Sequence, residues 1–174
     1  VVMNYLANAL PLNGKTTGEL SGLFPNLFVP AGITFSIWVV IYLMLLYFCI
    51  VQFSGAGQQA AASVGWFFAV SCVFNALWIV FWHYGKISLS VVVMLGLLAT
   101  LVYVNYQLKM LPPGGVKAAF GIYLGWICIA TIANITALLV HLNWSGGGLS
   151  AEVWTILLIA AGFVITAFSM ARLN

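Results

Sequence analysis

Charge is what this sequence has least of. Only 4% of its 174 residues are charged, five basic and two acidic, for a formal net charge of +3. A soluble globular domain carries about 25% charged residues, so a chain this poor in charge could not present a polar surface to water. The charge is also too small for a nucleic-acid-binding protein, and no basic patch concentrates it. The scarcity of charge therefore favours a protein that resides in the lipid bilayer.

Acidic residues are too few and too scattered for catalysis. The two carboxylates, Glu19 and Glu152, both lie outside the middle of the apolar runs. They form neither a carboxylate pair nor the chain of acid and base groups that ion-coupled pumps use. There is no phosphate-binding Gly-rich loop either. We predict that the chain is not an enzyme and that it has no catalytic residues.

Metal-binding and disulfide-forming patterns are missing as well. Cys49, Cys72 and Cys128 occur one each in three separate apolar runs. Without CxxC or Cys/His spacing they are expected to be buried small hydrophobes, and no metal site is predicted. His83 and His141 lie near helix ends, where an interfacial polar role is more typical than ligation of haem or chlorophyll.

What the chain has in abundance is hydrophobic residues, 64% of the total. Membrane-spanning structures must satisfy every backbone polar group internally, which leaves helices or closed barrels. A barrel would show short segments of alternating polarity, whereas this chain shows long, continuous apolar runs. We predict an integral, multi-pass membrane protein with an all-α fold, a polytopic transmembrane helical bundle. Residues 1–174 form a single transmembrane domain, because five or six spans of about 20 residues nearly use up the length.

Five long helices and one truncated helix are expected. The first apolar run, residues 1–10, is too short to span and lacks the charged segment of a signal peptide, so we interpret it as the end of a helix. A polar loop over residues 11–29 follows. The long helices are expected over residues 30–53, 62–83, 88–109, 117–143 and 152–172. A slight excess of Lys and Arg on the face opposite the long loop favours that face as cytoplasmic.

Polar and indole side chains converge at one depth below the long loop. Trp38, Asn75 and Asn134 each lie eight or nine residues from the end of their helix nearest the loop, or about 12–14 Å beneath the surface. Trp78 is slightly higher and Tyr42 slightly lower. An intramembrane Asn often joins helices, worth on the order of 1 kcal/mol, and this alternative stays open for each Asn. Together the residues favour a ligand pocket between helices.

Two further patterns concern the outside of the bundle. Four tryptophans near helix ends are predicted to form an interfacial aromatic belt: Trp66, Trp82, Trp144 and Trp154. Gly121 and Gly125 form a GxxxG pattern, which lets another helix approach closely. That helix can belong to this chain or to a partner, so a homodimer or a larger membrane complex through Gly121 and Gly125 is an open alternative.

Three segments carry a family pattern. Pro30, Trp38 and Tyr42 give P-x7-W-x3-Y. Asn75 and Trp78 give N-x2-W, with the aromatic pair Phe81 and Trp82 after it. The third segment gives Y-L-x-W-x4-T-x2-N through Tyr123, Trp126, Thr131 and Asn134. With these spacings on three separate helices, the stretch from Asn4 to Asn143 resembles the translocator protein / tryptophan-rich sensory protein (TspO/MBR) family, as a divergent member.

The resemblance implies five family-like helices, the first one truncated, plus one extra C-terminal helix. It implies that the long loop is a lid and that tetrapyrroles or sterol-like apolar ligands bind beneath it. A bound tetrapyrrole is the one cofactor it suggests. The ligand-binding candidates are Trp38, Tyr42, Asn75, Trp78, Trp126 and Asn134. The chain departs from the family at Gly32, where many members have a pocket Trp, and at Ile79 and Val80, where prolines are usual.

Two functions from different classes follow as hypotheses. The first is an integral membrane protein that binds, and senses or transports, a tetrapyrrole or sterol-like apolar ligand between its helices. The alternative is a non-catalytic, pigment-binding or pigment-free accessory subunit of a larger membrane complex. The alternative rests on the GxxxG pattern, the extra last helix and the near absence of charge.

Overall fold

A computed structural model of the chain describes residues 12–173, apart from the side chains of residues 56 and 170–173. The predicted truncated helix over residues 1–10 lies outside the described residues. Within residues 12–173 every regular element is helical, which confirms the predicted all-α class. The elements are η1 (Leu12–Gly14), α2 (Thr17–Ser21), η2 (Gly32–Ser36), α3 (Ile37–Val51), α4 (Gly55–Val64), α5 (Phe67–His83), α6 (Ile87–Leu108), α7 (Gly115–His141), η3 (Gly146–Gly148) and α8 (Ala151–Leu173).

Four segments of the described chain are long and apolar enough to cross a membrane. They are Gly32–Val51, Ile87–Leu108, Gly115–His141 and Ala151–Ser169. Helices α4 and α5 together make a fifth candidate span, bent by 61°. The spans agree with the polytopic bundle predicted from the apolar runs, because each can cover a hydrocarbon layer of about 30 Å.

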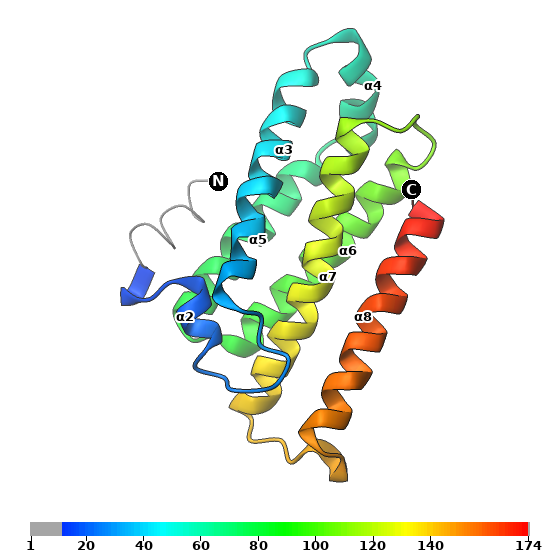
Figure 1. The fold of residues 1–174 in the computed structure, drawn as a ribbon. Coiled ribbons are helices and arrows are strands. Elements are labelled where there is room, and N and C mark those ends of the chain that lie inside the picture. The colour runs from blue at the N-terminus through cyan, green and yellow to red at the C-terminus, as the bar shows by residue number, and fades with distance from the viewer. Residues whose placement is uncertain (1–11, 174) are drawn as a thin grey trace.

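The spans form a bundle with α7 near its centre (Figure 1). Helix α6 packs between α5 and α7, and α3 lies against α7. Side chains of Ile41, Ile79, Leu101 and Ile127, one from each of these four helices, are completely buried. The core is therefore shared by α3, α5, α6 and α7. The family pattern lies on α3, α5 and α7, and α6 packs between α5 and α7.

The bend between α4 and α5 was not predicted. Residues between the expected helices over 30–53 and 62–83 form the start of α4. Its N-terminus is capped by the Ser54 hydroxyl, which accepts a bond from Gly57 N–H at 3.3 Å. Ala60 and Val64 of α4 are buried in the core, which stabilises a helix that Ala already favours. Gly65, with a φ of +53°, ends α4 and turns the chain into α5.

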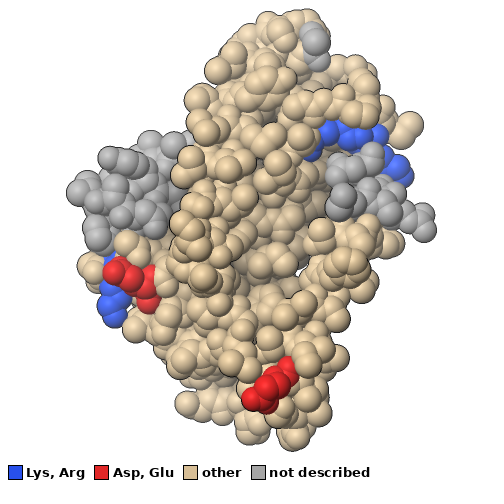
Figure 2. Space-filling view, viewed as in Figure 1, with Lys and Arg blue, Asp and Glu red and all other residues tan. Residues whose placement is uncertain are grey.

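On the face shown in Figure 2, the charged side chains lie at the left, in the lower part and at the upper right, with a wide uncharged surface between them. One of them, Lys117, is only 8% exposed. Its ammonium group is nevertheless hydrogen-bonded, because Nζ donates to the carbonyl oxygens of Lys109 and Leu111 at 3.3 and 3.2 Å. These carbonyls lie just past the end of α6, where a cation is electrostatically favoured. A lysine at a helix start thus closes the Pro-Pro-Gly-Gly turn.

Helix α8 stands at the edge of the bundle beside α7 (Figure 1). Only 6% of its apolar, membrane-spanning segment is buried. Its one buried residue among those described is Gly162, where an added methyl group would meet Cδ1 of Ile129 at 3.3 Å. The absence of a side chain at Gly162 is therefore what allows α8 to approach α7.

Candidate functional site

The polar loop after residue 11 is a folded lid over one end of the bundle. Its short helix α2 begins at a capping box, in which Glu19 N–H donates to Thr16 Oγ1 at 3.3 Å and Thr16 N–H donates to Glu19 Oε2 at 2.7 Å. The bond from the Thr16 backbone, followed by the bond from its hydroxyl, lowers the pKa of Glu19. The lid is thus an ordered element, which the composition of the loop did not indicate.

His83 at the end of α5 holds the lid. Its imidazole is 1% exposed, with Nδ1 lying 3.0 Å from the carbonyl oxygen of Leu12 and Nε2 lying 3.1 Å from Thr17 Oγ1. A carbonyl only accepts, so Nδ1 carries the proton and, in the neutral ring, Nε2 accepts from the Thr17 hydroxyl. Asn13 Nδ2 also donates to the His83 carbonyl at 3.0 Å. Lid and bundle are joined by three hydrogen bonds around one residue.

The predictions for the helix-end residues were partly wrong. His83 was expected to be an interfacial polar residue, and Trp82 a member of the aromatic belt, but both are buried under the lid. Trp82 Nε1 donates to the carbonyl oxygen of Thr17 at 3.4 Å. Trp66, by contrast, is 86% exposed, as a belt residue should be. The lid explains why Trp82 and His83 are buried while Trp66 is exposed. Counting residues along the helices could not show where the lid lies.

Below the lid, five aromatic rings from α3, α5 and α7 form one cluster around Trp38. Tyr42 stacks on Trp38 at a centroid distance of 5.5 Å and an interplanar angle of 17°. The rings of Trp78, Trp126 and Tyr123 lie 6.3, 6.1 and 6.0 Å from the Trp38 ring. Such offset and edge-on arrangements are the favourable ones for aromatic pairs. The structure thus brings together the four aromatic candidates Trp38, Tyr42, Trp78 and Trp126.

Three indole groups of this cluster are unsatisfied. Nε1 of Trp38, Trp78 and Trp126 is buried and has no hydrogen-bond partner among the described residues. A buried tryptophan N–H usually finds an acceptor, and leaving a buried donor unpaired costs about 1–3 kcal/mol. Three such donors side by side are exceptional, and they are the main polar feature of the site.

A small, partly enclosed cavity lies between the lid and two members of the cluster, Trp78 and Trp126. Its walls come from the lid, η2, α5 and α7, and they include Thr17, Phe35, Trp78, Trp82, Trp126 and Asn134. The cavity holds only about 20 Å³, which is room for one water molecule. A ligand larger than water therefore needs the lid or the rings to move.

The two asparagine candidates belong to different hydrogen-bond networks. Asn75 Nδ2 donates to the Tyr123 hydroxyl at 3.1 Å, and the Tyr42 hydroxyl donates to Asn75 Oδ1 at 3.3 Å. This network joins α5 to α7 and α3 on the far side of the tryptophans. The bonds support the alternative that an intramembrane Asn joins helices.

Asn134 lies on the other side, against α6. Its Nδ2 donates to Ser90 Oγ at 3.0 Å, and Ser90 Oγ lies 3.3 Å from its Oδ1. Asn134 also lines the cavity, so it joins helices and borders the site at once. Sequence reasoning overlooked Thr17 and Ser90 as supporting residues, and it assigned His83 an interfacial role rather than contact with the lid. None of them stands in a spacing that distinguishes it from an ordinary polar residue near a helix end.

No metal centre accompanies the site in the described part of the chain. There, no group of three or more His, Cys, Asp and Glu side chains comes close enough to hold a metal ion. The polar side chains that line the cavity carry hydroxyl, amide and indole groups. These groups can bind and orient a ligand through hydrogen bonds and stacking.

The apolar spans, the lid and the buried tryptophan cluster define a multi-pass membrane protein with a lidded, aromatic cavity. The family model described as TSPO-like protein matches residues 1–174, the whole chain. The chain therefore belongs to the TSPO-like protein family, and the resemblance noted in its sequence is confirmed. No curated protein and no solved structure matches it significantly.

Proposed function

We propose that this protein binds a flat, apolar ligand carrying several hydrogen-bond acceptors, of the tetrapyrrole class, between its tryptophans and its lid. One observation carries the proposal: Nε1 of Trp38, Trp78 and Trp126 is buried without an acceptor. A ligand that supplies acceptors would recover the free energy lost at these donors. A sterol-like ligand offers a single hydroxyl, so it supplies too few acceptors for the three unpaired indole N–H groups.

Ligand entry requires the lid to open. The cavity of about 20 Å³ has no room for such a ligand, and the bonds of His83 to Leu12 and Thr17 hold the lid in place over it. Binding would shift the equilibrium toward an open lid by as much as the ligand's affinity for the open form exceeds its affinity for the closed form. A ligand-dependent lid position is the physical basis that sensing or transport would need, and it requires no catalytic step.

The test is a titration with protoporphyrin IX in detergent, followed by the shift of the porphyrin absorbance band. Binding should saturate. Trp78→Phe and Trp126→Phe each keep an aromatic ring and remove one N–H, so each should raise the Kd about 2- to 10-fold, the effect of one net hydrogen bond. Trp66→Phe is the matched control, because Trp66 is 86% exposed and remote from the lid contacts. Equal effects of all three substitutions, or no saturation, would overturn the proposal.

A second candidate is the accessory subunit of a larger membrane complex. It is favoured by two surfaces: the span of α8 is 6% buried, and Gly125 faces an open groove in which an added methyl group meets nothing within 4 Å. The groove also takes in Val40 of α3 and Ile122 of α7. Small residues on an open face suit a second helix. Purification in mild detergent followed by mass measurement tests it, since a lone monomer or homodimer would count against it.

A further inference from the structure

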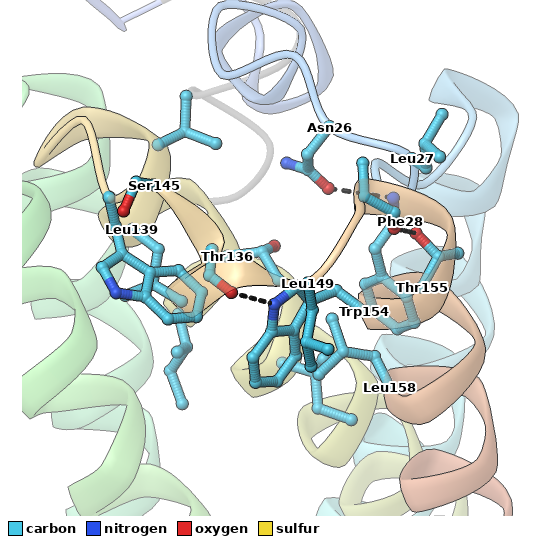
Figure 3. A pocket seen from close by; sticks show the side chains of 16 residues that line it. Asn26, Leu27, Phe28, Thr136, Leu139, Ser145, Leu149, Trp154, Thr155 and Leu158 are labelled. Atoms are coloured by element: carbon cyan, nitrogen blue, oxygen red, sulfur yellow. Dashed lines mark hydrogen bonds between the residues drawn. The ribbon is translucent and has the colours of Figure 1, made fainter.

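A second, larger hollow lies outside the tryptophan cluster. It has a volume of about 430 Å³ and lies between the lid-side ends of α7 and α8, with Asn26 and Phe28 of the lid at its border (Figure 3). We propose that this pocket is a lipid site, which holds one acyl chain of a membrane phospholipid from the leaflet on the lid side. The site exists only because this chain has α8, and it does not depend on the function proposed above.

The pocket arises from the way α8 meets α7. The two helices touch at Gly162, whose position would place a methyl group 3.3 Å from Ile129 and 3.7 Å from Ile132. Ile132 is also the deepest α7 residue of the pocket lining. Above this contact the helices leave a slot. The ring pair of Trp144 and Trp154, with centroids 5.2 Å apart, borders its outer end.

The walls of the slot suit hydrocarbon. Ile135, Leu139 and Leu158 supply apolar surface. The polar groups on the walls are already bonded to their own chain: the Thr136 hydroxyl donates to Ala133 and the Thr155 hydroxyl to Ala151, both at 2.8 Å. The lining therefore has little to offer a polar ligand deep in the slot, which favours an occupant without hydrogen-bonding groups there.

The indole of Trp154, at the border of the slot, is already hydrogen-bonded. Its Nε1 donates to the carbonyl oxygen of Gly146 at 2.8 Å, unlike the unpaired indoles under the lid. The described residues that line the slot include no Lys, Arg, His, Asp or Glu. A ligand rich in hydrogen-bond acceptors would find the Trp154 N–H already bonded, whereas the indoles under the lid are unpaired, so the slot and the tryptophan cluster suit different ligands.

The depth of the slot points to an acyl chain. From Ile132 to Val140 the lining of α7 covers eight residue steps, or about 12 Å, close to the roughly 15 Å of one leaflet. Polar groups, among them Asn26 and Ser145, occur at the end nearest the membrane surface. This polarity gradient matches a phospholipid whose headgroup stays at the lid and whose chain runs down between α7 and α8. The volume falls in the range of about 300–1,000 Å³ of ordinary ligand sites.

Photo-labelling of the full chain in nanodiscs tests the proposal. The probes are two phosphatidylcholines, one with a diazirine near the ester and one with a diazirine near the terminal methyl of the acyl chain. Labelled residues are mapped by proteolysis and mass spectrometry. The first probe should label near Trp144 and Leu149, and the second near Ile132 and Leu158. This comparison uses only the unaltered protein, so it does not depend on a variant folding.

A pair of variants sharpens the test. Leu158→Trp fills the slot and should reduce labelling of residues 132–140 about tenfold relative to the unaltered chain. Ile159→Trp is the matched control, because Ile159 is 59% exposed on the same helix, and it should leave that labelling unchanged. Even labelling of the outer face of α8, equal effects of the two substitutions, or stronger labelling of the slot by a diazirine sterol would overturn the proposal.

Discussion

Thr17 and His83 lie 66 positions apart in the chain, yet Oγ1 of Thr17 lies 3.1 Å from Nε2 of His83 in a buried contact. The contact fixes the lid helix α2 to the end of α5, directly above the tryptophan cluster. Because the other ring nitrogen of His83 is bonded to the Leu12 carbonyl oxygen at 3.0 Å, one side chain holds two parts of the lid. The position of the lid is thus coupled to a small number of hydrogen bonds.

Thr17→Val should loosen the lid without filling the cavity. The substitution keeps the shape of the side chain but removes the hydroxyl and leaves His83 Nε2 unpaired. A net hydrogen bond is worth about 0.5–1.5 kcal/mol, so the lid should open about 2- to 10-fold more often. Hydrogen exchange of backbone amides in Thr17–Ser21 measures this opening. Thr155→Val, which removes an exposed hydroxyl from α8, is the control. Unchanged exchange in Thr17→Val would contradict the role of the Thr17–His83 bond in holding the lid.

Acid should weaken the lid through Glu19. The pKa of Glu19 is lowered from its ordinary 4.5, first by the Thr16 backbone bond and then by the Thr16 hydroxyl. Its capping contribution is therefore fully present above the unfolded pKa and is lost as pH falls through the folded pKa. Hydrogen exchange at the start of α2 should rise below about pH 4.5 once the intrinsic pH dependence is removed. Glu19→Gln should abolish that rise, and a rise that survives the substitution would assign it to another group.

Asn75 and Tyr123 should be energetically coupled. Their bond of 3.1 Å joins α5 to α7 inside the bundle. Asn75→Ala and Tyr123→Phe are each expected to destabilise the fold, and the double-mutant cycle should return a coupling energy of about 0.6 kcal/mol, the typical value for such pairs in membrane proteins. Unfolding in detergent measures the three variants. Additive effects would show that the bond contributes nothing to stability.

The residues that could be predicted from the sequence are those fixed by helical periodicity. Asn75, Trp78 and Trp82 stand at i, i+3 and i+7, and all three are buried on one face of α5. Trp38 was placed by counting its depth below Pro30, whereas Trp126 was implied only by the family resemblance. Apolar runs of spanning length predicted the spans themselves, since the bilayer sets that length.

What could not be predicted depends on contacts between distant segments. The lid helix α2 has five residues and is ordered by His83, which lies on another helix. The bend at Gly65 depends on the packing of Ala60 and Val64 against the core, so composition suggested a loop there. Counting depth placed Asn75 and Asn134 at one level, but it did not assign their bonding partners, Tyr123 and Ser90. Contacts between distant segments produce no recognisable spacing pattern in a single sequence, so they could not be predicted.

If the unpaired indoles beneath the lid bind ligand acceptors, as we propose, the indole N–H signals of the seven tryptophans report it directly. With ¹⁵N-labelled tryptophan, saturating protoporphyrin IX should shift the signals of Trp38, Trp78 and Trp126 downfield, in the direction of hydrogen-bond formation. The signals of Trp66, Trp144 and Trp154, which lie away from the cavity, should stay in place. Unmoved signals from all three buried indoles, or equal shifts of all seven, would contradict the account.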